Sequence, residues 1–409
     1  MIKEFIKKFT PKRILSAYHF SLAFLGAFFY GFPSRKIKAI GVTGTNGKTT
    51  VTEMISKILE EAGFKVALLN SIHFKIGGME RANDLRMTMP GRFKLQKFLR
   101  EAVDSKCQYV VLEITSEGIK QYRHKFIDFA AAVLTNLSLE HIEAHGSFEK
   151  YREAKGEFFK ACKKVHVINK DDPNASYFLQ FPADSKILYS LKDKDRFLSK
   201  IRLLGEFNIY NAIAAIQTGL SQGVNLVSCL RAIEKVELIP GRMELVISEP
   251  FKVFVDYAFT PNALEQVYKT LTKSPNHPIT QSLICVLGAC GGGRDKWKRP
   301  VLGGIAARYC KDIIVTNEDP YDENPVEIVE QVARGAENIS LNQDLNQRKS
   351  AVLKILDRRE AIREALKTAK RGDIVIITGK GSEPSICLAG GKKIPWDDRK
   401  VVKEEFNKL

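Results

Sequence analysis

The first half of the chain alternates short apolar runs with longer segments in which apolar residues recur at helical spacing. The apolar runs predict buried strands at Ile37–Val42, Val66–Leu69, Tyr109–Glu113, Ala131–Leu134 and Val165–Asn169. The segments between them predict helices at Val51–Glu61, Phe93–Val103, Phe148–Cys162 and Asn208–Gln222. Because strands that are apolar throughout are buried on both faces, the pattern favours a mostly parallel sheet covered by helices.

The alternation breaks at Leu238–Arg242, where the Pro-Gly pair is typical of a turn and suggests a hinge. It then resumes. The later apolar runs predict strands at Val253–Val255, Leu283–Leu287, Ile313–Val315 and Ile374–Thr378, and the later periodic segments predict helices at Ala263–Thr270, Val301–Tyr309, Pro325–Arg334 and Ala361–Ala369. We therefore expect an α/β protein with a central domain at 37–238 and a smaller, Rossmann-like domain at 239–409, preceded by a separate segment at 1–36.

The stretch Ile14–Phe32 is rich in aromatic and aliphatic residues and follows a basic stretch, whose members are Lys3, Lys7, Lys8, Lys12 and Arg13. It carries no cleavage signal before the first predicted strand, so a signal peptide is disfavoured. It is also short for a membrane span. Two interpretations remain: a helix packed on the protein body, which we favour, or a helix at 14–32 that lies on the cytoplasmic face of a membrane.

Composition narrows the class of protein only in part. The chain has 409 residues, a net charge of +17 and an ordinary globular composition, so it fits two or three domains that bind polyanionic ligands. Basic residues are spread along the chain without a nucleic-acid recognition module, so we expect no nucleic-acid partner. Seven cysteines without a C-x-x-C pair indicate reduced thiols in a cytoplasmic protein. We also expect the protein to be a monomer.

The segment Gly41–Thr50 contains the pattern G-T-N-G-K-T-T between a predicted strand and a predicted helix. Glycines at such a turn let backbone N–H groups face phosphate oxygens, while Lys48 and the helix N-terminus add positive charge. Val42 stands where the strict phosphate-loop pattern has glycine. The segment predicts ATP binding with Mg²⁺ held through Thr49, and the residues expected at the nucleotide are Gly44, Thr45, Asn46, Gly47, Lys48, Thr49 and Thr50.

Three further residues are candidates for a phosphate site, of which two follow predicted strands and one lies on a predicted helix. Glu113 ends a buried strand, and in a parallel sheet ligands bind beyond the carboxyl ends of strands, so its carboxylate can hold Mg²⁺. His141 follows the strand at Ala131–Leu134 and could be a metal ligand. Lys155 lies on a predicted helix. Taken singly, each has a structural explanation: a strand-end glutamate, a structural histidine and a solvated lysine.

The order of local motifs resembles the Mur ligase family, and most closely its MurE type. The motifs are G-T-N-G-K-T-T, E-x-T-S, T-N-L-S-x-x-H-x-x-x-H-G, Y-x-x-A-K, G-x-F-N-x-x-N, P-G-R-M-E, V-D-Y-A, G-G-G-R-D-K and G-K-G-x-E. The resemblance runs from about Lys38 to the C-terminus. It implies an ATP-dependent amide ligase of peptidoglycan precursor synthesis, in which the carboxylate of a UDP-N-acetylmuramoyl-dipeptide-like acceptor becomes an acyl phosphate and then receives an amino acid.

The same resemblance implies a role for individual residues. The catalytic set would be Lys48, Glu113, His141 and Lys155, and the magnesium set would be Thr49, Glu113, His141 and Lys155 as a carbamate. The muramoyl-peptide acceptor would contact Thr88, Thr115, Gln121 and Arg123, and the nucleotide would also contact Asn208, Asn211, Arg242 and Asp256. The incoming amino acid would contact Arg294, Glu318, Asp319, Tyr321, Gly379 and Glu383.

The chain also departs from the family pattern. Phe259, Glu117 and Ser382 each stand where the family has histidine. Only about 40 residues precede the phosphate loop, too few for the UDP-binding N-terminal domain of MurE-type enzymes, so we expect that domain to be lacking. Family members that add meso-diaminopimelate carry arginine at the position of Tyr321, where it grips the distal carboxylate. Because tyrosine cannot form that bidentate pair, the sequence predicts lysine, ornithine or another diamine-type amino acid.

Two other functions stay open at this point. The first is the same chemistry on another acceptor, as in folylpolyglutamate or cyanophycin synthesis. The second is a non-catalytic nucleotide-binding scaffold, which the altered histidines suggest, although Lys48, Glu113, His141 and Lys155 are all present.

Overall fold

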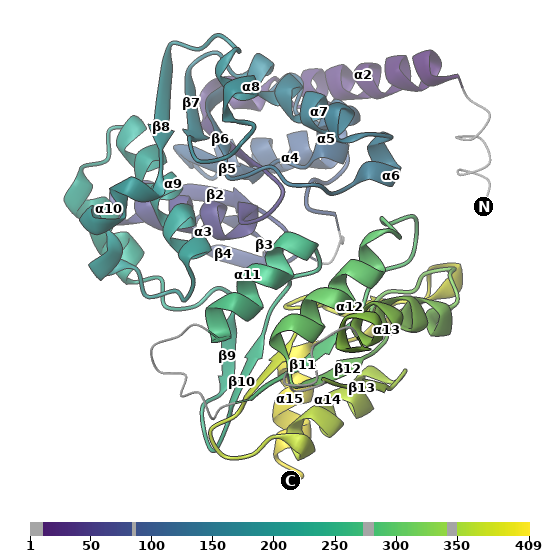
Figure 1. The fold of residues 1–409 in the computed structure, drawn as a ribbon. Coiled ribbons are helices and arrows are strands. Elements are labelled where there is room, and N and C mark those ends of the chain that lie inside the picture. Colours follow the sequence, from purple (N-terminus) through teal and green to yellow (C-terminus); the bar gives the residue numbers. More distant parts are fainter. Residues whose placement is uncertain (1–10, 84–86, 273–281, 342–349) are drawn as a thin grey trace. The chain divides into compact units, whose positions relative to one another are not determined.

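The computed structural model describes residues 11–83, 87–272, 282–341 and 350–409. The chain forms two compact units (Figure 1). Unit 1 comprises residues 1–137, 148–202 and 208–237, and unit 2 comprises residues 138–147, 203–207 and 238–409. Two short segments from within the predicted central domain are therefore grouped with unit 2. Of the basic residues predicted to precede the first helix, Lys3, Lys7 and Lys8 lie outside the described residues.

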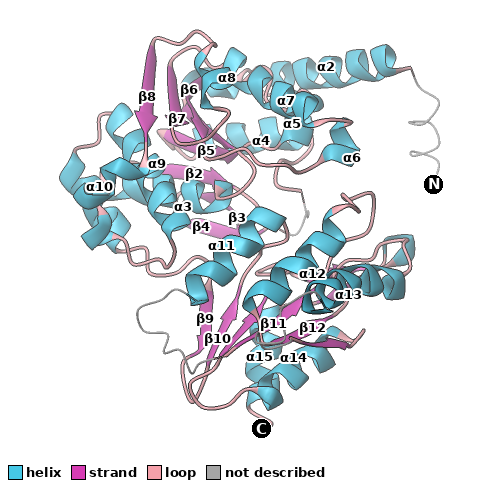
Figure 2. Ribbon diagram, viewed as in Figure 1, coloured by secondary structure: helices cyan, strands magenta, loops and turns pink. Residues whose placement is uncertain are grey.

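Unit 1 is built on an eight-stranded sheet in the order β4-β3-β2-β5-β1-β6-β7-β8 (Figure 2). Its strands are β1 Lys38–Thr43, β2 Val66–Leu69, β3 His73–Ile76, β4 Met79–Ala82, β5 Tyr109–Glu113, β6 Phe129–Leu134, β7 Val165–Asn169 and β8 Ser185–Tyr189. The strands run parallel except at one edge, where β3 and β4 form an antiparallel extension of β2. The five strands predicted in this region are confirmed, whereas β3, β4 and β8 are additional.

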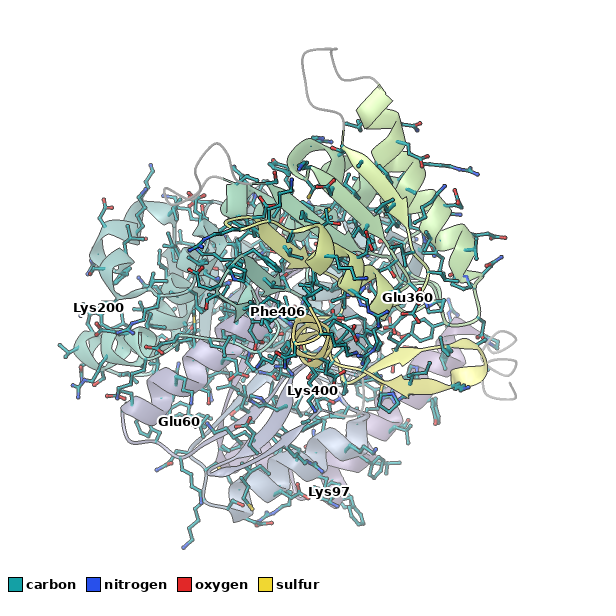
Figure 3. The ribbon with its side chains drawn as sticks, turned by 90° about the horizontal axis from the view of Figure 1, so that it is seen from below. Glu60, Lys97, Lys200, Glu360, Lys400 and Phe406 are labelled. Carbon is teal, nitrogen blue, oxygen red and sulfur yellow. The ribbon has the colours of Figure 1, made fainter. Side chains whose placement is uncertain are left out.

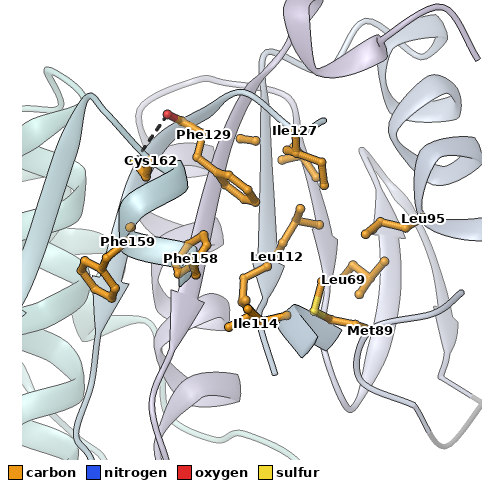
Figure 4. Close-up of a cluster of buried hydrophobic side chains, with 14 of the residues drawn as sticks. Leu69, Met89, Leu95, Leu112, Ile114, Ile127, Phe129, Phe158, Phe159 and Cys162 are labelled. Atoms are coloured by element: carbon orange, nitrogen blue, oxygen red, sulfur yellow. Dashed lines mark hydrogen bonds between the residues drawn. The ribbon is translucent and has the colours of Figure 1, made fainter. Parts of the chain in front are cut away.

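Helices cover the sheet of unit 1, as the apolar strands predict. They are α2 Lys12–Phe29, α3 Lys48–Glu61, α4 Arg92–Asp104, α5 Ser116–Lys120, α7 Phe148–Ala161, α8 Ala175–Leu179, α9 Glu206–Ser221 and α10 Leu226–Glu234. Figure 4 shows part of the core, where Phe158 of α7 lies against Phe129 of β6 with ring centroids 4.9 Å apart. A β-carbon on Gly41 would lie 2.4 Å from Phe158, so glycine in the central strand lets this ring pack flush on the sheet.

Unit 2 contains a six-stranded sheet in the order β13-β12-β11-β14-β10-β9. Its strands are β9 Glu244–Ile247, β10 Lys252–Val255, β11 Leu283–Leu287, β12 Asp312–Val315, β13 Ala351–Lys354 and β14 Ile374–Ile377, all parallel except β9. Its longer helices are α11 Pro261–Thr272, α12 Lys298–Tyr309, α13 Pro325–Leu341, α14 Arg358–Thr368 and α15 Asp398–Phe406. A short hairpin, β15 Ser385–Cys387 with β16 Lys393–Pro395, and the one-turn helix α6 Ile142–His145 complete the elements used below.

Each face of this sheet has its own apolar core. Residues of α11, α12 and α13 pack on one face, and residues of α14 and α15 pack on the other. Figure 3 labels Glu360 on α14, and Lys400 and Phe406 on α15, which is seen end-on in this view. A fully buried ion pair joins the two helices there, with 2.7 Å between Nη2 of Arg358 and Oδ2 of Asp398. The strands and helices predicted for this half of the chain are confirmed.

Candidate active site

The predicted phosphate loop follows β1 and leads into α3. Two glycines in it are required by close packing, because a β-carbon on Gly44 would lie 1.9 Å from Oγ1 of Thr135 and one on Gly47 would lie 2.3 Å from Oδ1 of Asn211. Gly47 also has φ +79° and precedes the first turn of α3, which no side chain among the described residues caps. Because a helix N-terminus carries partial positive charge, this turn suits an anionic ligand.

The residues that follow β6 hold the phosphate loop in place. The backbone N–H of Thr45 donates to the carbonyl of Asn136 at 2.8 Å, and the N–H of Asn46 donates to the Asn136 side chain at 3.0 Å. The hydroxyl of Thr135 donates to the carbonyl of Asn46 at 2.7 Å. The T-N pair of the T-N-L-S motif thus fixes the shape of the loop from the neighbouring strand.

Four predicted site residues meet beneath this loop. The hydroxyl of Thr49 donates to Oε2 of Glu113 at 2.9 Å, and Nζ of Lys48 lies 4.0 Å from Oε1 of the same carboxylate. Nζ of Lys155, which is 1% exposed, donates to the carbonyl of Gly44 at 2.8 Å. Hydroxyl and carboxylate oxygens are donors that Mg²⁺ prefers, so Thr49 and Glu113 fit the predicted ion.

Lys155 differs from an ordinary surface lysine in its chemistry. Burial, followed by the charge of Lys48, lowers its pKa well below the usual value, while Glu113 opposes this shift. Its ammonium also lies 4.7 Å from the centre of the Tyr151 ring. A lysine with a lowered pKa has a larger fraction of neutral amine, and only the neutral amine can react with CO₂ to form a carbamate.

Helix α9 meets the loop through its predicted nucleotide residues. The side chain of Asn211 donates to Oδ1 of Asn208 at 3.1 Å, and both residues are buried. The contact between Asn211 and Gly47 brings this pair against the start of α3. The structure therefore brings together the phosphate loop, Glu113, Lys155, Asn208 and Asn211 within unit 1.

Of the four predicted acceptor residues, Thr115, Gln121 and Arg123 lie at the two ends of the short helix α5 in unit 1. Thr115 caps α5 by accepting from the N–H of Gly118 at 3.1 Å. Arg123 donates to Oε1 of Gln121 at 2.8 Å and also to the carbonyl of Met89, which is the residue after Thr88. The guanidinium thus joins the loop that carries Thr88 to the turn that follows α5.

A second arginine lies at this turn, and the sequence patterns did not reveal it. Nε of Arg92 donates to the carbonyl of Gln121 at 2.9 Å, and the Arg92 guanidinium also contacts Nδ1 of His19. Burial, followed by the charge of Arg123, lowers the pKa of Arg92, and burial lowers the pKa of Arg123 as well. Because both guanidinium groups bond to neutral amide oxygens, at Gln121 and Met89, this turn is suited to an anionic group. The only sequence signal for Arg92 was its position at the start of a predicted helix.

His141 is held within unit 2 by a set of contacts that no local pattern reveals. It has φ +59° and precedes α6. On its N-terminal side, Oε1 of Glu140 accepts from the ammonium of Lys298 at 2.6 Å, and both side chains are buried. On its C-terminal side, the N–H of Glu143 donates to Oδ1 of Asp295 at 2.8 Å. The segment 138–147 is therefore fastened to the start of α12.

Phe259, which replaces a family histidine, takes part in the same arrangement. The ammonium of Lys298 lies 4.9 Å from the centre of the Phe259 ring. The ring of Tyr257 lies edge-on to it, with centroids 5.0 Å apart. An aromatic face attracts a cation, so the Phe259 ring stabilises the charge of the buried lysine.

The carboxyl ends of β10, β12 and β14 bring the remaining predicted residues together in unit 2. Asp256, which follows β10, accepts from the N–H groups of Met243 and Ala258, each at 2.6 Å. Burial raises the pKa of Asp256, and the charge of Arg242 opposes that shift. The Arg242 guanidinium lies 4.4 Å from the centre of the Tyr257 ring.

A buried acidic cluster surrounds Lys380. Its ammonium donates to Oδ2 of Asp319 at 2.8 Å and also contacts Glu383, whose other oxygen accepts from the hydroxyl of Tyr257 at 2.9 Å. Glu318 is 1% exposed, and among the described residues its Oε2 has no hydrogen-bond partner. A β-carbon on Gly379, which has φ +104°, would lie 2.4 Å from that oxygen, so glycine keeps the space beside it open.

The last two predicted amino-acid contacts are Arg294, in the loop that follows β11, and Tyr321, in the loop that follows β12. Tyr321 has φ +52°, and its N–H donates to the carbonyl of Cys387 at 3.2 Å. Gly292 packs against the Tyr321 ring, because a β-carbon there would lie 2.6 Å from it. Arg294 lies in the same loop as Gly292, and its side chain is exposed. The turn interpreted as a hinge is also packed here, since a β-carbon on Gly241 would lie 2.2 Å from the backbone of Ser382.

Comparison with known proteins agrees with this arrangement of motifs. The profile of the Mur ligase middle domain matches residues 42–219, and that of the Mur ligase glutamate ligase domain matches residues 241–381. The chain is 36% identical over 412 residues to the UDP-N-acetylmuramoyl-L-alanyl-D-glutamate–2,6-diaminopimelate ligase of Syntrophomonas wolfei, covering 94% of this chain and 81% of that protein. It is also 36% identical over 429 residues to the UDP-N-acetylmuramyl-tripeptide synthetase of Roseiflexus sp., covering 95% and 82%.

The chain belongs to the Mur ligase family. Mur ligases are ATP-dependent enzymes of peptidoglycan synthesis that form amide bonds, and the chain is such a ligase. A solved UDP-N-acetylmuramoyl-L-alanyl-D-glutamate–2,6-diaminopimelate ligase matches with a TM-score of 0.59 at 30% identity, covering 91% of this chain and 78% of that one. Folylpolyglutamate synthase of Mycobacterium tuberculosis, complexed with ADP and AMPPCP, shares the fold with a TM-score of 0.68 at 18% identity, covering 88% and 92%.

Proposed function

We propose that this Mur ligase adds an amino acid to the carboxylate of a muramoyl-dipeptide-like acceptor by way of an acyl phosphate. The observation that carries the proposal is the cluster of Lys48, Thr49, Glu113 and Lys155 beneath a tightly fixed phosphate loop. The overall similarity to two muramoyl-peptide ligases supports the class of acceptor.

The cluster can offset the negative charges that meet in the first step of the reaction. An acceptor carboxylate and a triphosphate are both anions, so bringing them together requires fixed positive charge. Lys48 and the N-terminus of α3 supply part of it. Mg²⁺ held by Thr49 and Glu113 would supply the rest by neutralising phosphate oxygens. In this proposal Lys155 acts as its carbamate, whose added carboxylate would help to hold a second Mg²⁺.

The arginine-bearing turn after α5 is the proposed anchor for the acceptor. Arg123 and Arg92 present two partly buried guanidinium groups beside Thr115 and Gln121. Planar guanidinium groups bind carboxylate or phosphate through paired hydrogen bonds, so the turn fits an acceptor with several acidic groups. The net positive charge of the chain favours the same kind of ligand.

The acidic cluster of unit 2 is the proposed site for the incoming amino acid. The unpartnered oxygen of Glu318 lies beside the open space at Gly379 and can accept from an ammonium group. No arginine occupies the position of Tyr321, so we retain lysine, ornithine or another diamine-type residue as the predicted substrate. Relatives are named as 2,6-diaminopimelate ligases, and meso-diaminopimelate is therefore the competing substrate to measure.

Phosphate release tests the proposed reaction. Wild-type protein should release phosphate from ATP only when a UDP-muramoyl-dipeptide and an amino acid are both present. Lys48→Ala and Lys155→Ala should each reduce the rate by at least about a hundredfold, because each removes a charge from the reacting centre. Lys160→Ala is the matched control, since Lys160 lies on the same helix as Lys155 but is exposed, and its rate should match the wild type.

The panel of acceptors separates the remaining alternatives. Turnover with a folate-glutamate acceptor and none with muramoyl-dipeptide would replace the proposed acceptor. ATP binding without turnover for any acceptor would instead support the scaffold interpretation.

A separate measurement tests carbamylation: ¹³CO₂ should give a carbamate carbon signal in the wild type that is absent in Lys155→Ala and present in Lys160→Ala. Full activity of Lys155→Ala would remove the carbamate from the mechanism.

A further inference from the structure

Helix α2 carries its largest apolar side chains on the outside. Seven large apolar residues on its 18 positions are exposed: Ile14, Tyr18, Phe20, Phe24, Leu25, Phe28 and Phe29. The buried positions are instead small, at Ala23, Gly26 and Ala27. Ordinary surface helices have the opposite arrangement, with large apolar residues facing the core.

The helix is nevertheless firmly attached to unit 1. The hydroxyl groups of Ser16 and Tyr122 lie 2.8 Å apart, and the rings of Phe20 and Phe24 meet Phe126 with centroids 5.3 and 5.5 Å away. A β-carbon on Gly26 would lie 3.5 Å from the backbone of α4, so the two helices pack closely. The prediction that this segment packs on the protein body is therefore confirmed. The described part of unit 1 covers the outer face only in part, because its seven large side chains remain 43–73% exposed.

The charged residues next to this apolar face are all basic. The sequence from Phe5 to Thr52 contains no aspartate or glutamate. Exposed basic residues stand at both ends of the helix, with Arg13 in its first turn and Arg35 and Lys36 in the short turn that follows it. Phe93 of α4 extends the apolar surface, with its ring 6.5 Å from that of Phe29.

We propose that the outer face of α2 docks onto an anionic membrane surface. A helix with exposed aromatic residues and basic flanks lies in the interface, its apolar face among the acyl chains and its cations near anionic headgroups. Within the described residues, no helix is long and apolar enough to cross a bilayer, which agrees with docking rather than spanning. The proposal goes beyond the ligase reaction and does not depend on it.

The charge pattern also distinguishes a membrane from a second copy of the chain. Because both ends of α2 are basic, two copies of the helix packed face to face would bring like charges together in either orientation. An anionic lipid surface would instead neutralise both ends at once. A lipid surface therefore fits the apolar face and its flanks together, and self-association fits only the apolar face.

Vesicle co-sedimentation of the full chain tests the proposal. The protein should bind vesicles containing phosphatidylglycerol at least about tenfold more strongly than vesicles of phosphatidylcholine alone, and the difference should shrink at high salt. The double variant Phe28→Ser with Phe29→Ser should bind the anionic vesicles at least about tenfold more weakly, because both side chains are largely exposed and available to insert. Arg13→Gln with Arg35→Gln should also weaken binding.

Matched controls come from exposed residues elsewhere on unit 1. Leu198→Ser with Val227→Ser also removes two exposed apolar side chains, and Lys192→Gln with Arg196→Gln also removes two exposed charges. Both controls should bind vesicles as the wild type does, and all variants should keep the wild-type melting temperature and ATP affinity. Equal binding by test and control variants, or failure of the wild type to bind, would overturn the proposal. So would a dimer in analytical ultracentrifugation that Phe28→Ser with Phe29→Ser dissolves.

Discussion

The requirement for glycine at position 47 can be isolated by comparing two glycines that flank the same helix. Gly47 precedes α3 with φ +79°, and Gly63 follows it with φ +88°. Alanine at either position would adopt a similarly strained backbone, which costs about 1–2 kcal/mol. A β-carbon at position 63 would meet no atom of the described residues within 4 Å, whereas one at position 47 would lie 2.3 Å from Oδ1 of Asn211.

The additional cost at position 47 follows from how Asn211 is held. Asn211 is buried, and its side-chain amide donates to Asn208, so it cannot move aside without breaking that hydrogen bond. Asn211 either stays and is overpacked or moves and loses its buried hydrogen bond, and either outcome adds roughly 1–3 kcal/mol to the backbone strain. Gly47→Ala should therefore lower the free energy of unfolding by about 2–5 kcal/mol, whereas Gly63→Ala should lower it by only about 1–2 kcal/mol.

The assay combines urea denaturation with ATP titration calorimetry. Gly63→Ala should bind ATP within about twofold of the wild type, whereas Gly47→Ala should bind at least about tenfold more weakly, because about 1.4 kcal/mol of loop distortion corresponds to tenfold. In an Asn211→Ala background, Gly47→Ala should cost only about as much stability as Gly63→Ala does, since the clash is gone. Equal stability and equal ATP affinity of Gly47→Ala and Gly63→Ala would refute the close contact between α9 and the phosphate loop.

Three further outcomes follow from charged groups and from the amino-acid site. Burial lowers the pKa of His73, but the hydrogen bond and charge of Glu53 outweigh burial and raise this pKa above the usual value. The stability difference between the wild type and His73→Gln should therefore be full below the unfolded pKa and fall by about 1 kcal/mol as pH rises through the folded pKa. Urea melts of both proteins at about pH 6 and 8 measure this difference, and the opposite trend would contradict the prediction. Lys298→Met should destabilise unit 2 by about 3–5 kcal/mol in thermal melts because Glu140 stays buried without its partner, and Lys298→Met with Glu140→Gln should recover much of that loss. Tyr321→Arg should raise the kcat/KM for meso-diaminopimelate relative to lysine by at least about tenfold, and an unchanged ratio would remove position 321 from amino-acid selection.

Local patterns were enough to predict the phosphate loop and the strands around it. The strand, the glycines and the Lys-Thr pair of Gly41–Thr50 are contiguous, so their chemistry can be read without knowing the fold. The β3–β4 hairpin was missed because β4 is exposed along its length and lacks an apolar pattern. Its polar residues contact α3 through the ion pair between His73 and Glu53, 3.0 Å apart, which only the tertiary structure reveals.

Sequence patterns could not predict contacts between residues that are far apart in the chain. Arg92 joins Arg123 at the turn after α5 because α4 and the end of α5 are neighbours, and neither residue signals the other in the sequence. In the same way, the segment around His141 is fastened to Asp295 and Lys298 from much later in the chain. Helix α2 was predicted to pack, but the outward direction of its aromatic residues depended on which face met α4.

The central claim is that ATP drives formation of an amide bond between a muramoyl-peptide carboxylate and an amino acid. The most direct measurement is mass spectrometry of UDP-muramoyl-dipeptide incubated with the protein, ATP, Mg²⁺ and a panel of amino acids that includes lysine, ornithine and meso-diaminopimelate. The expected result is an acceptor heavier by one amino-acid residue, with one ADP formed per product, and no product from Lys48→Ala. Bound ATP with no mass shift for any amino acid in the panel would contradict it.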